Sequence, residues 1–389
     1  MVTLQSADKA LKSFYLDAIA ETLNFKTNPF LAQVQRTSAD VTGKDVRKTV
    51  RLGVNGGIGA GTETGELPEA KNSEYAQLVT TLKNLYGRIE ISDKALRAAA
   101  NNEGAFVDLL NEEMQSLVKS ATFNFGRMLF CDGTGAATFT HGGAGTSVYV
   151  DNASGLEAGM YIDFFAPSGD PVPDYQNVKI NKVNRSNGEL IIDIDGFVDD
   201  LSLIDGYRIA VHGSYGNEIT GLEAIFGDDE IYGVARDSSL MTPTVVENAG
   251  VISENVIQKT IDDVEMTSGS KVNFIICSWG VRRAIMEYYN GLNKSLPTMQ
   301  IAGGYTALNF NGIPIVVDRF CPRGTMYLLN TEDFKLHQLC DWQWLEAEDG
   351  KILKQIPGKP VYTATLVKYA ELMCERPCGQ AKITGITEK

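Results

Sequence analysis

The sequence predicts an α+β protein built from several structural units. The segment from Ala105 to Cys131 has the apolar period of one long helix, whereas the segment from Ser147 to Gly213 has short apolar runs separated by turn residues, as in an all-β unit. After Gly213, helical and strand-like patterns alternate. The 389 residues suffice for two or three domains, because a domain commonly has about 100–200 residues.

The chain opens with a segment that has a loosely amphipathic pattern. Between Ser6 and Leu23 its apolar residues are Ala10, Leu11, Phe14, Leu16, Ala18 and Ile19. This pattern predicts one short helix. Asn28 and Pro29 end it, since a residue before proline disfavours the helical conformation.

Two alternating segments then flank a glycine-rich stretch. Lys48 to Val54 and Ala76 to Ile91 both alternate like strands. They predict one extended hairpin, whose tip and hinge would be formed by Gly53, Gly56, Gly57, Gly59, Gly61, Gly65 and Pro68. A hairpin of that length cannot bury both faces within its own chain, so we expect it to lie on something else.

Two helices are predicted next. Ser92 is a suitable N-cap for a short helix from Asp93 to Ala100. The helix from Ala105 to Cys131 would be roughly 40 Å long at 1.5 Å per residue. Its predicted core face consists of Phe106, Leu110, Leu117, Ala121, Phe125 and Met128.

The segment from Gly133 to Gly145 is rich in Gly, Thr and Ala, and its composition predicts a linker. The strand-like runs that follow are Ser147–Val150, Met160–Phe165, Val178–Val183, Glu189–Ile194 and Tyr207–Val211. Their spacing predicts a small β-barrel or β-sandwich inserted into the chain.

The rest of the chain predicts an α/β unit and closing strands. The expected elements are helices over Ser253–Thr267 and Trp279–Gly291, and strands over Val272–Cys277, Ile315–Val317, Met326–Asn330 and Val361–Glu371. Asn311-Gly312 favours a tight turn just before the buried strand at Ile315.

Motifs for phosphate, metal or nucleophilic chemistry are incomplete. The glycines from Gly57 to Gly61 lack the Gly-Lys-Ser/Thr ending of a phosphate loop, and Asp193 with Asp195 lacks the closing Glu of a calcium loop. Ser278 has no flanking glycines, so it is better explained as the N-cap of the next helix. Asp228, Asp229 and Glu230 are expected in a solvated loop.

Metal-ligand spacing is also missing. His141, His212 and His337 stand far apart, so each is expected to be a surface or linker histidine. Cys374 and Cys378 could share a face, but further zinc ligands could come only from the distant Cys340 or His337. We therefore expect no catalytic residue, no cofactor and no metal site.

Composition limits the possible partners. Thirty-five Lys and Arg against 49 Asp and Glu give a net charge of −14, which disfavours tight binding to a polyphosphate. No run approaches 18 apolar residues, and the segment from Met1 to Phe14 does not resemble a secretory signal. Synthesis and folding in the cytosol are expected, with the six dispersed Cys as small buried side chains.

The order of these elements resembles the Hong Kong 97-type major capsid proteins of tailed bacteriophages. The most specific similarity is the run from Gly303 to Asp318, which contains Asn-Gly-Ile-Pro, followed by the run from Cys321 to Asn330. Gly65-Glu-Leu-Pro68 and Ser92-Asp-Lys-Ala-Leu96 are similar to family motifs as well, so the resemblance covers nearly the whole chain.

The resemblance implies a domain order. It would be an N-terminal arm (1–45), an extended loop (46–91), a peripheral domain with a spine helix (92–137), a β-rich insertion (138–217), an apical domain (218–325) and closing strands (326–389). The β-rich insertion departs from the minimal family pattern. No Lys and Asn pair is assigned to covalent cross-linking.

The function that the resemblance implies is structural. The chain would assemble with itself into hexamers and pentamers of an icosahedral head, made in the host cytoplasm, which encloses double-stranded DNA without reading its sequence. The N-terminal arm is too short for a fused scaffolding domain, which implies a separate scaffolding protein or a processed chain. A portal protein and decoration proteins would be further partners, and no membrane would be involved. An encapsulin-like compartment is one alternative, and a hydrolase using Ser278 or the acidic cluster at Asp228 is another.

Overall fold

The computed structural model describes residues 28–53, 55–94, 103–193, 205–227, 230–236, 240–293, 297–300, 306–346, 350 and 352–389. The predicted helix from Ser6 to Leu23 and most of the one from Asp93 to Ala100 lie outside this range. The chain forms two compact units. We call them the helix–barrel unit (Met1–Gln33, Lys83–Thr220, Gln338–Ala370) and the hairpin–α/β unit (Val34–Leu82, Gly221–His337, Glu371–Lys389).

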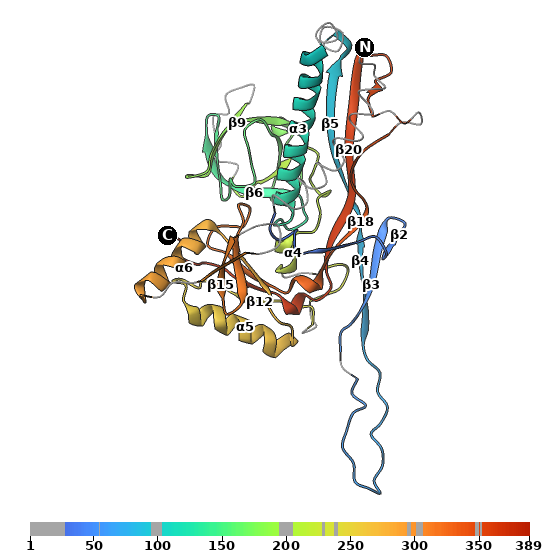
Figure 1. The fold of residues 1–389 in the computed structure, drawn as a ribbon, viewed down its shortest axis with the longest axis vertical. Helices are drawn as coiled ribbons and strands as arrows, with labels where there is room; N and C mark the ends of the chain where they lie inside the picture. Colours follow the sequence, from blue (N-terminus) through green and yellow to red (C-terminus); the bar gives the residue numbers. More distant parts are fainter. Residues whose placement is uncertain are drawn as a thin grey trace. The chain divides into compact units, whose positions relative to one another are not determined.

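The long predicted helix is present in the helix–barrel unit as α3 (Glu103–Met128). Figure 1 shows α3 lying along β5 (Lys83–Ser92) and β20 (Val361–Cys374), which pair in antiparallel fashion over all ten residues of β5. The helix approaches the strand closely at Gly87, where a Cβ atom would lie 3.0 Å from Leu117 Cδ1.

The buried face of α3 overlaps the predicted one. Phe125 and Met128 are buried and Leu117 is half-buried, and Met114 and Val118 are buried in addition. The side chains of Phe106 and Leu110 lie outside the described part of the chain. Two further strands, β18 (Phe334–Trp344) and β19 (Lys354–Gln355), belong to the same sheet as β20.

Of the two arrangements that the strand spacing predicts for the β-rich segment, the structure has the closed barrel. Its strand order is β10-β7-β6-β11-β8-β9. The bounds are β6 (Ala136–Ala144), β7 (Ser147–Val150), β8 (Tyr161–Phe165), β9 (Val178–Asn184), β10 (Glu189–Asp193) and β11 (Arg208–Val211). Alternate residues such as Val148, Ile162, Phe164 and Ile180 fill its interior.

The prediction of a linker from Gly133 to Gly145 is wrong, because most of this segment is β6. Thr138 and Thr140 are β-branched and suit a strand. The register between β6 and β7 shifts between Thr140 and Gly143, so the glycines mark a bulge inside the strand. Glycine density alone therefore does not separate a bulged barrel strand from a linker.

The α/β part of the second unit has a seven-stranded sheet in the order β12-β21-β17-β13-β16-β15-β14. The bounds are β12 (Thr244–Val246), β13 (Phe274–Cys277), β14 (Thr298–Gln300), β15 (Thr306–Phe310), β16 (Ile313–Val317), β17 (Met326–Leu329) and β21 (Ala381–Ile383). A short helix, α4 (Leu222–Ile225), precedes the sheet.

Helices α5 (Glu254–Ser268) and α6 (Trp279–Gly291) share one apolar core with Ile275 and Cys277 of β13. Each helix has a serine N-cap, because Ser253 accepts a hydrogen bond from Val256 N and Ser278 accepts one from Val281 N. No helix in the described ranges has the length and apolarity needed to cross a membrane.

The predicted hairpin is present, but its second strand is shorter than expected. β3 (Asp45–Arg51) pairs with β4 (Tyr75–Thr81), and β2 (Val41–Thr42) completes a three-stranded sheet. The prediction of one continuous strand from Ala76 to Ile91 is wrong, because β4 ends before Leu82 and β5 pairs with β20 instead.

The sequence itself contains the reason for this break. Leu78 and Leu82 are buried at even positions, whereas Leu85, Ile89 and Ile91 are buried at odd positions. Side chains of one strand alternate strictly between its faces, so a change of phase requires a break or a bulge.

Candidate functional site

The predicted tip and hinge residues all fall in one loop, which joins β3 to β4 and which we call the hairpin loop (residues 52–74, of which 54 is not described). Leu52 N donates a hydrogen bond of 2.9 Å to Glu74 O at its base, and Gly65 N donates one of 3.1 Å to Thr62 O near its tip. Figure 1 shows the two limbs of the loop running out side by side from β3 and β4.

The glycines of the first limb face the second limb. A Cβ atom on Gly57 would lie 3.1 Å from Lys71 N and 3.3 Å from Glu69 O, and one on Gly59 would lie 3.1 Å from Pro68 Cγ. Backbone atoms cannot give way as a flexible side chain does. The limbs can therefore lie this close together at Gly57 only because that residue has no side chain.

The hairpin loop presents apolar side chains to solvent. Ile58 is 88% exposed and Leu67 is 90% exposed, so neither is packed against the described part of the chain. The loop also contains four glutamates and only one basic residue, Lys71. A projecting element with large exposed apolar side chains is typical of a surface that is completed by another molecule.

The root of the hairpin, which we define as residues 35–51, is held by a cluster of ion pairs. Lys48 on β3 lies 3.5 Å from both Asp40 and Glu375, and Lys335 on β18 lies 2.8 Å from Glu375. Partial burial opposes the charge on Lys48, but the carboxylates of Glu375 and Asp40 outweigh it and raise the pKa of this lysine. His337 is fully buried next to this cluster.

The burial of His337 corrects the prediction that all three histidines are surface or linker residues. His141 and His212 are exposed, whereas His337 lies on β18, where it is paired with Thr37 of β1 (Gln35–Thr37). The sequence around His337 gives no sign that this side chain is buried. The charged groups beside it, which include Asp40, Lys48 and Glu375, belong to distant parts of the chain.

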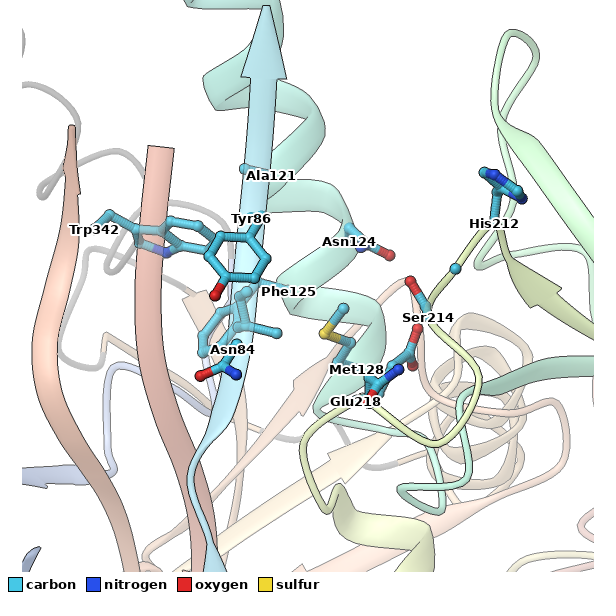
Figure 2. Close-up of a pocket in the computed structure, with 13 residues that line it drawn as sticks. Asn84, Tyr86, Ala121, Asn124, Phe125, Met128, His212, Ser214, Glu218 and Trp342 are labelled. Atoms are coloured by element: carbon cyan, nitrogen blue, oxygen red, sulfur yellow. The ribbon is translucent and has the colours of Figure 1, made fainter. Parts of the chain in front are cut away.

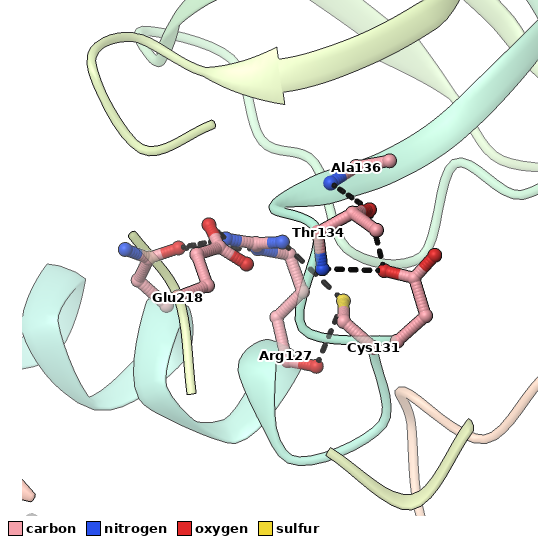
Figure 3. A network of polar contacts seen from close by, with 7 residues as sticks. Arg127, Cys131, Thr134, Ala136 and Glu218 are labelled. Carbon is pink, nitrogen blue, oxygen red and sulfur yellow. Dashed lines mark hydrogen bonds and ion pairs between the residues drawn. The ribbon is translucent and has the colours of Figure 1, made fainter. Parts of the chain in front are cut away.

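In the helix–barrel unit, a buried ion pair joins the end of α3 to the segment that leaves the barrel. Figure 3 shows Arg127 contacting both Glu218 and Cys131. Arg127 also donates hydrogen bonds of 2.8 and 3.1 Å to Asn124 Oδ1. Gly155 leaves room for the arginine, because a Cβ atom there would lie 2.8 Å from Arg127 Cδ.

Burial controls the protonation behaviour of this network. Desolvation raises the pKa of Glu218, although Arg127 opposes the shift, and desolvation raises the pKa of Cys131 to about 12. A thiol with such a pKa is unreactive at neutral pH. The entry and exit segments of the barrel meet beside it, where Gly216 N donates a hydrogen bond of 2.7 Å to Thr134 O.

A cavity of about 230 Å³ lies between α3, β5 and the segment that leaves the barrel. Its lining includes Tyr86, Asn124, Phe125, Ser214 and Trp342 (Figure 2). The imidazole of His212 hydrogen-bonds to Asp163, and in Figure 2 it points away from Met128 and Glu218.

The other candidates for chemistry have structural roles. Ser278 caps α6 and its hydroxyl donates to the carboxylate of Glu388, so it is contacted by an acid and not by a histidine. Cys374 and Cys378 are buried free thiols. In the described ranges, no three His, Cys, Asp or Glu side chains are grouped as metal ligands would be. Asp228, Asp229 and Asp195 lie outside the described residues.

No family model matches the sequence, and no curated protein matches it. Solved structures do match. The cyanophage A-1(L) capsid asymmetric unit is 10% identical with a TM-score of 0.57, covering 95% of this chain and 92% of that chain. The capsid of an empty GTA particle is 10% identical with a TM-score of 0.50, covering 91% of this chain and 88% of that chain.

An encapsulin complex from Synechococcus elongatus is 10% identical with a TM-score of 0.46, covering 93% of this chain and 89% of that chain, and this likeness is too low to favour either kind of shell. The cyanophage and GTA likenesses extend over nearly the whole chain, as the resemblance in the sequence does. These likenesses show the fold: the chain has the mixed α+β fold of these two capsid structures.

Proposed function

We propose that this chain is the major capsid protein of a tailed bacteriophage and that its work is done by assembly. The observation that carries the proposal is the hairpin loop, a projecting element on which Ile58 and Leu67 are about nine-tenths exposed. A monomer gains nothing from such an element. A shell subunit gains a contact, because a neighbouring copy buries those side chains.

In this proposal the units carry the domain roles of the Hong Kong 97-type fold. The hairpin and its loop form the extended loop, α3 is the spine helix of the peripheral domain, and the sheet with α5 and α6 is the apical domain. The barrel from Ala136 to Val211 is an insertion. Residues 1–45 form an arm that grips a neighbouring subunit.

Assembly would use heterologous contacts between identical copies, which generate closed rings when the rotation between copies closes. Five-fold and six-fold rings then form the icosahedral head around double-stranded DNA. The net charge of −14 keeps the wall from adhering to the DNA it encloses. A separate scaffolding protein guides assembly, a portal protein occupies one vertex, and decoration proteins bind the outer surface.

The decisive experiment is electron microscopy and analytical ultracentrifugation of the purified chain, alone and with its cognate scaffolding protein. Hollow polyhedral particles or isolated hexamers and pentamers are expected. A chain that stays monomeric at micromolar concentration with the scaffold present contradicts the proposal. DNA in particles isolated from cells supports a phage head, whereas enclosed enzymes would identify a compartment.

A variant with a shortened hairpin loop tests whether this loop is needed for assembly. Replacing residues 56–69 by a short Gly-Ser turn should abolish particles while the circular dichroism and unfolding midpoint of the chain stay unchanged, because the loop packs on nothing else in the described structure. The matched control carries Thr62→Ala and Thr64→Ala, which keep the length and the apolar side chains of the loop. Normal particles from the shortened variant would remove the loop from the mechanism.

A further inference from the structure

The root of the hairpin contains a buried titratable group that assembly does not require. His337 has no exposed surface, and among the described residues neither of its ring nitrogens has a hydrogen-bond partner. One ring nitrogen always carries a proton, so a donor is buried without an acceptor, which destabilises the folded state. An apolar side chain would fit this place better.

The charged groups around His337 come from each element that packs on it. Lys335 lies on the same strand, Lys48 comes from β3, Asp40 precedes β2, and Glu375 follows β20. Arg36 on β1 is paired with Leu336 and so points to the opposite face of the sheet. Two carboxylates and two ammonium groups therefore face the imidazole, and they already satisfy one another as ion pairs.

The attachment that these groups provide is small. β1 pairs with β18 over three residues only, and Thr37 is the residue opposite His337. Beyond this pairing, the ion pairs of Lys48 and Glu375 connect the hairpin root to β18 and to the end of β20. A charge placed at His337 would act on both of these connections at once. The hydrogen bond of 3.0 Å from Val79 N to Tyr232 O and the buried side chains of Val46 and Leu78 hold the hairpin sheet independently of them.

We propose that His337 is a pH-operated latch for the root of the hairpin: when it is neutral the root is fastened to β18, and when it gains a proton this fastening is released. An imidazolium at this position repels Lys48 and Lys335 and competes for the carboxylates of Asp40 and Glu375. It also needs solvation, which the closed pairing of β1 with β18 denies it. The inference concerns the isolated chain and does not depend on shell formation.

The direction of the pH effect follows from the linkage between proton binding by His337 and the stability of the closed root. Burial lowers the pKa of His337 below its usual value, with Lys335 and Lys48 adding to the effect and Asp40 and Glu375 opposing it. A histidine whose pKa is depressed on folding stabilises the closed root above about pH 6.5, and this stability is lost as the pH falls through the lower, folded pKa. Each unit of depression allows about a tenfold increase in opening on acidification.

Hydrogen exchange of the full chain tests the latch at pH 7.5 and pH 5.0, with rates divided by the intrinsic rate at each pH. Wild-type protection in peptides covering 35–51 should fall at the lower pH relative to peptides from α5, by about tenfold per unit of pKa depression. His337→Phe, which cannot take a proton, should show no such fall. His141→Phe, on the barrel, is the matched control and should behave like wild type.

The proposal is overturned if the hydrogen-exchange protection of the wild-type root does not change with pH. It is also overturned if His337→Phe loses protection at the root at pH 5.0 as the wild type does. Should His337→Phe fail to fold, nuclear magnetic resonance of the chain's three histidines decides instead. One imidazole should titrate below about pH 6.5 in step with exchange at the root. Titration of every imidazole without any change at the root would overturn the proposal equally, whether or not the chain assembles.

Discussion

At the scale of single residues, burial makes two carboxylates and one imidazole sensitive to their surroundings. Asp318, Glu218 and His337 are all nine-tenths or more buried, and desolvation disfavours the charged form of each. Glu218 has Arg127 as a counter-ion, whereas Asp318 relies on a hydrogen bond from Phe320 N and on the more distant charge of Arg319. Their contributions to stability are therefore of different kinds.

Asp318, which follows β16, should destabilise the α/β sheet at alkaline pH. Burial raises its pKa to about 7, and Oδ2 has no hydrogen-bond partner in the described part of the chain. A raised folded pKa means that the stability is complete below the unfolded pKa and is lost as the pH rises through about 7. Asp318→Asn should therefore raise the unfolding free energy at pH 8.5, on the order of 4 kcal/mol for a shift from 3.8 to about 7, and by less than half as much at pH 5.

Urea unfolding at the two pH values measures this effect. Glu265→Gln, an exposed carboxylate on α5, is the control and should change the midpoint little at either pH. An equal gain for Asp318→Asn at pH 5 and pH 8.5 would show that the ionised carboxylate is not the source of the instability.

The pair of Arg127 and Glu218 should show strong coupling. Arg127→Met leaves the Glu218 carboxylate buried without a counter-ion and should cost about 3–5 kcal/mol. The double variant Arg127→Met with Glu218→Leu removes both charges and should lose less than the single variant does. A double-mutant cycle on the unfolding of the helix–barrel unit measures the coupling, and simple additivity of the two changes would contradict it.

At the scale of elements, the hairpin loop depends on how closely its limbs approach. Gly57→Ala places a methyl group against the backbone of Lys71 and Glu69, whereas at Gly61 the nearest atom, Glu66 O, is 3.7 Å from the added Cβ. Gly57→Ala should spread the limbs and Gly61→Ala should not. Lys71 is the one basic residue between Leu52 and Glu74, so trypsin cleavage after it reports the change.

Cleavage after Lys71 should be severalfold faster in Gly57→Ala than in wild type, because a protease needs the chain to separate from its neighbour before it binds. Gly61→Ala, on the same limb, is the matched control and should be cut at the wild-type rate. Equal rates in both variants would mean that the limbs do not constrain each other in solution.

Elements with local signals were predictable from the sequence. Helices α5 and α6 agree with the predicted ranges within one residue at each end, because serine caps and apolar periods are local features. The pairing of β5 with β20 was not predictable, since Arg88 and Thr363 are 275 residues apart and either strand could have paired elsewhere. The break at Leu82 has a local signal too, because the apolar residues change from even positions at Leu78 and Leu82 to odd positions from Leu85 onward.

The candidate site also has one part that the sequence could predict and another that it could not. The glycines of the hairpin loop form one run in the sequence, so the loop could be predicted, and their part in assembly stays a proposal. Arg127 and Glu218 are 91 residues apart, and the groups around His337 come from four separate segments. Only tertiary structure brings such groups together, so no spacing rule could have found them.

At the scale of the whole molecule, the net charge and the exposed apolar loop have opposite effects on association. Copies that each carry a charge of −14 repel one another, so contacts between them need apolar burial to overcome the repulsion. Burying a leucine side chain contributes about 1.5–3 kcal/mol, and each copy in a shell makes the contact. Leu67 is the most exposed large apolar side chain of the loop.

Leu67→Asp should therefore prevent particle formation, because it replaces apolar burial by another negative charge at the contact. The variant should keep the wild-type unfolding midpoint, since Leu67 contacts nothing else in the described chain. Glu63→Gln, also in the loop, is the matched control and should assemble at least as well as wild type. Sedimentation and electron microscopy measure the particles, and normal shells from Leu67→Asp would show that the hairpin loop does not make the contact that closes the shell.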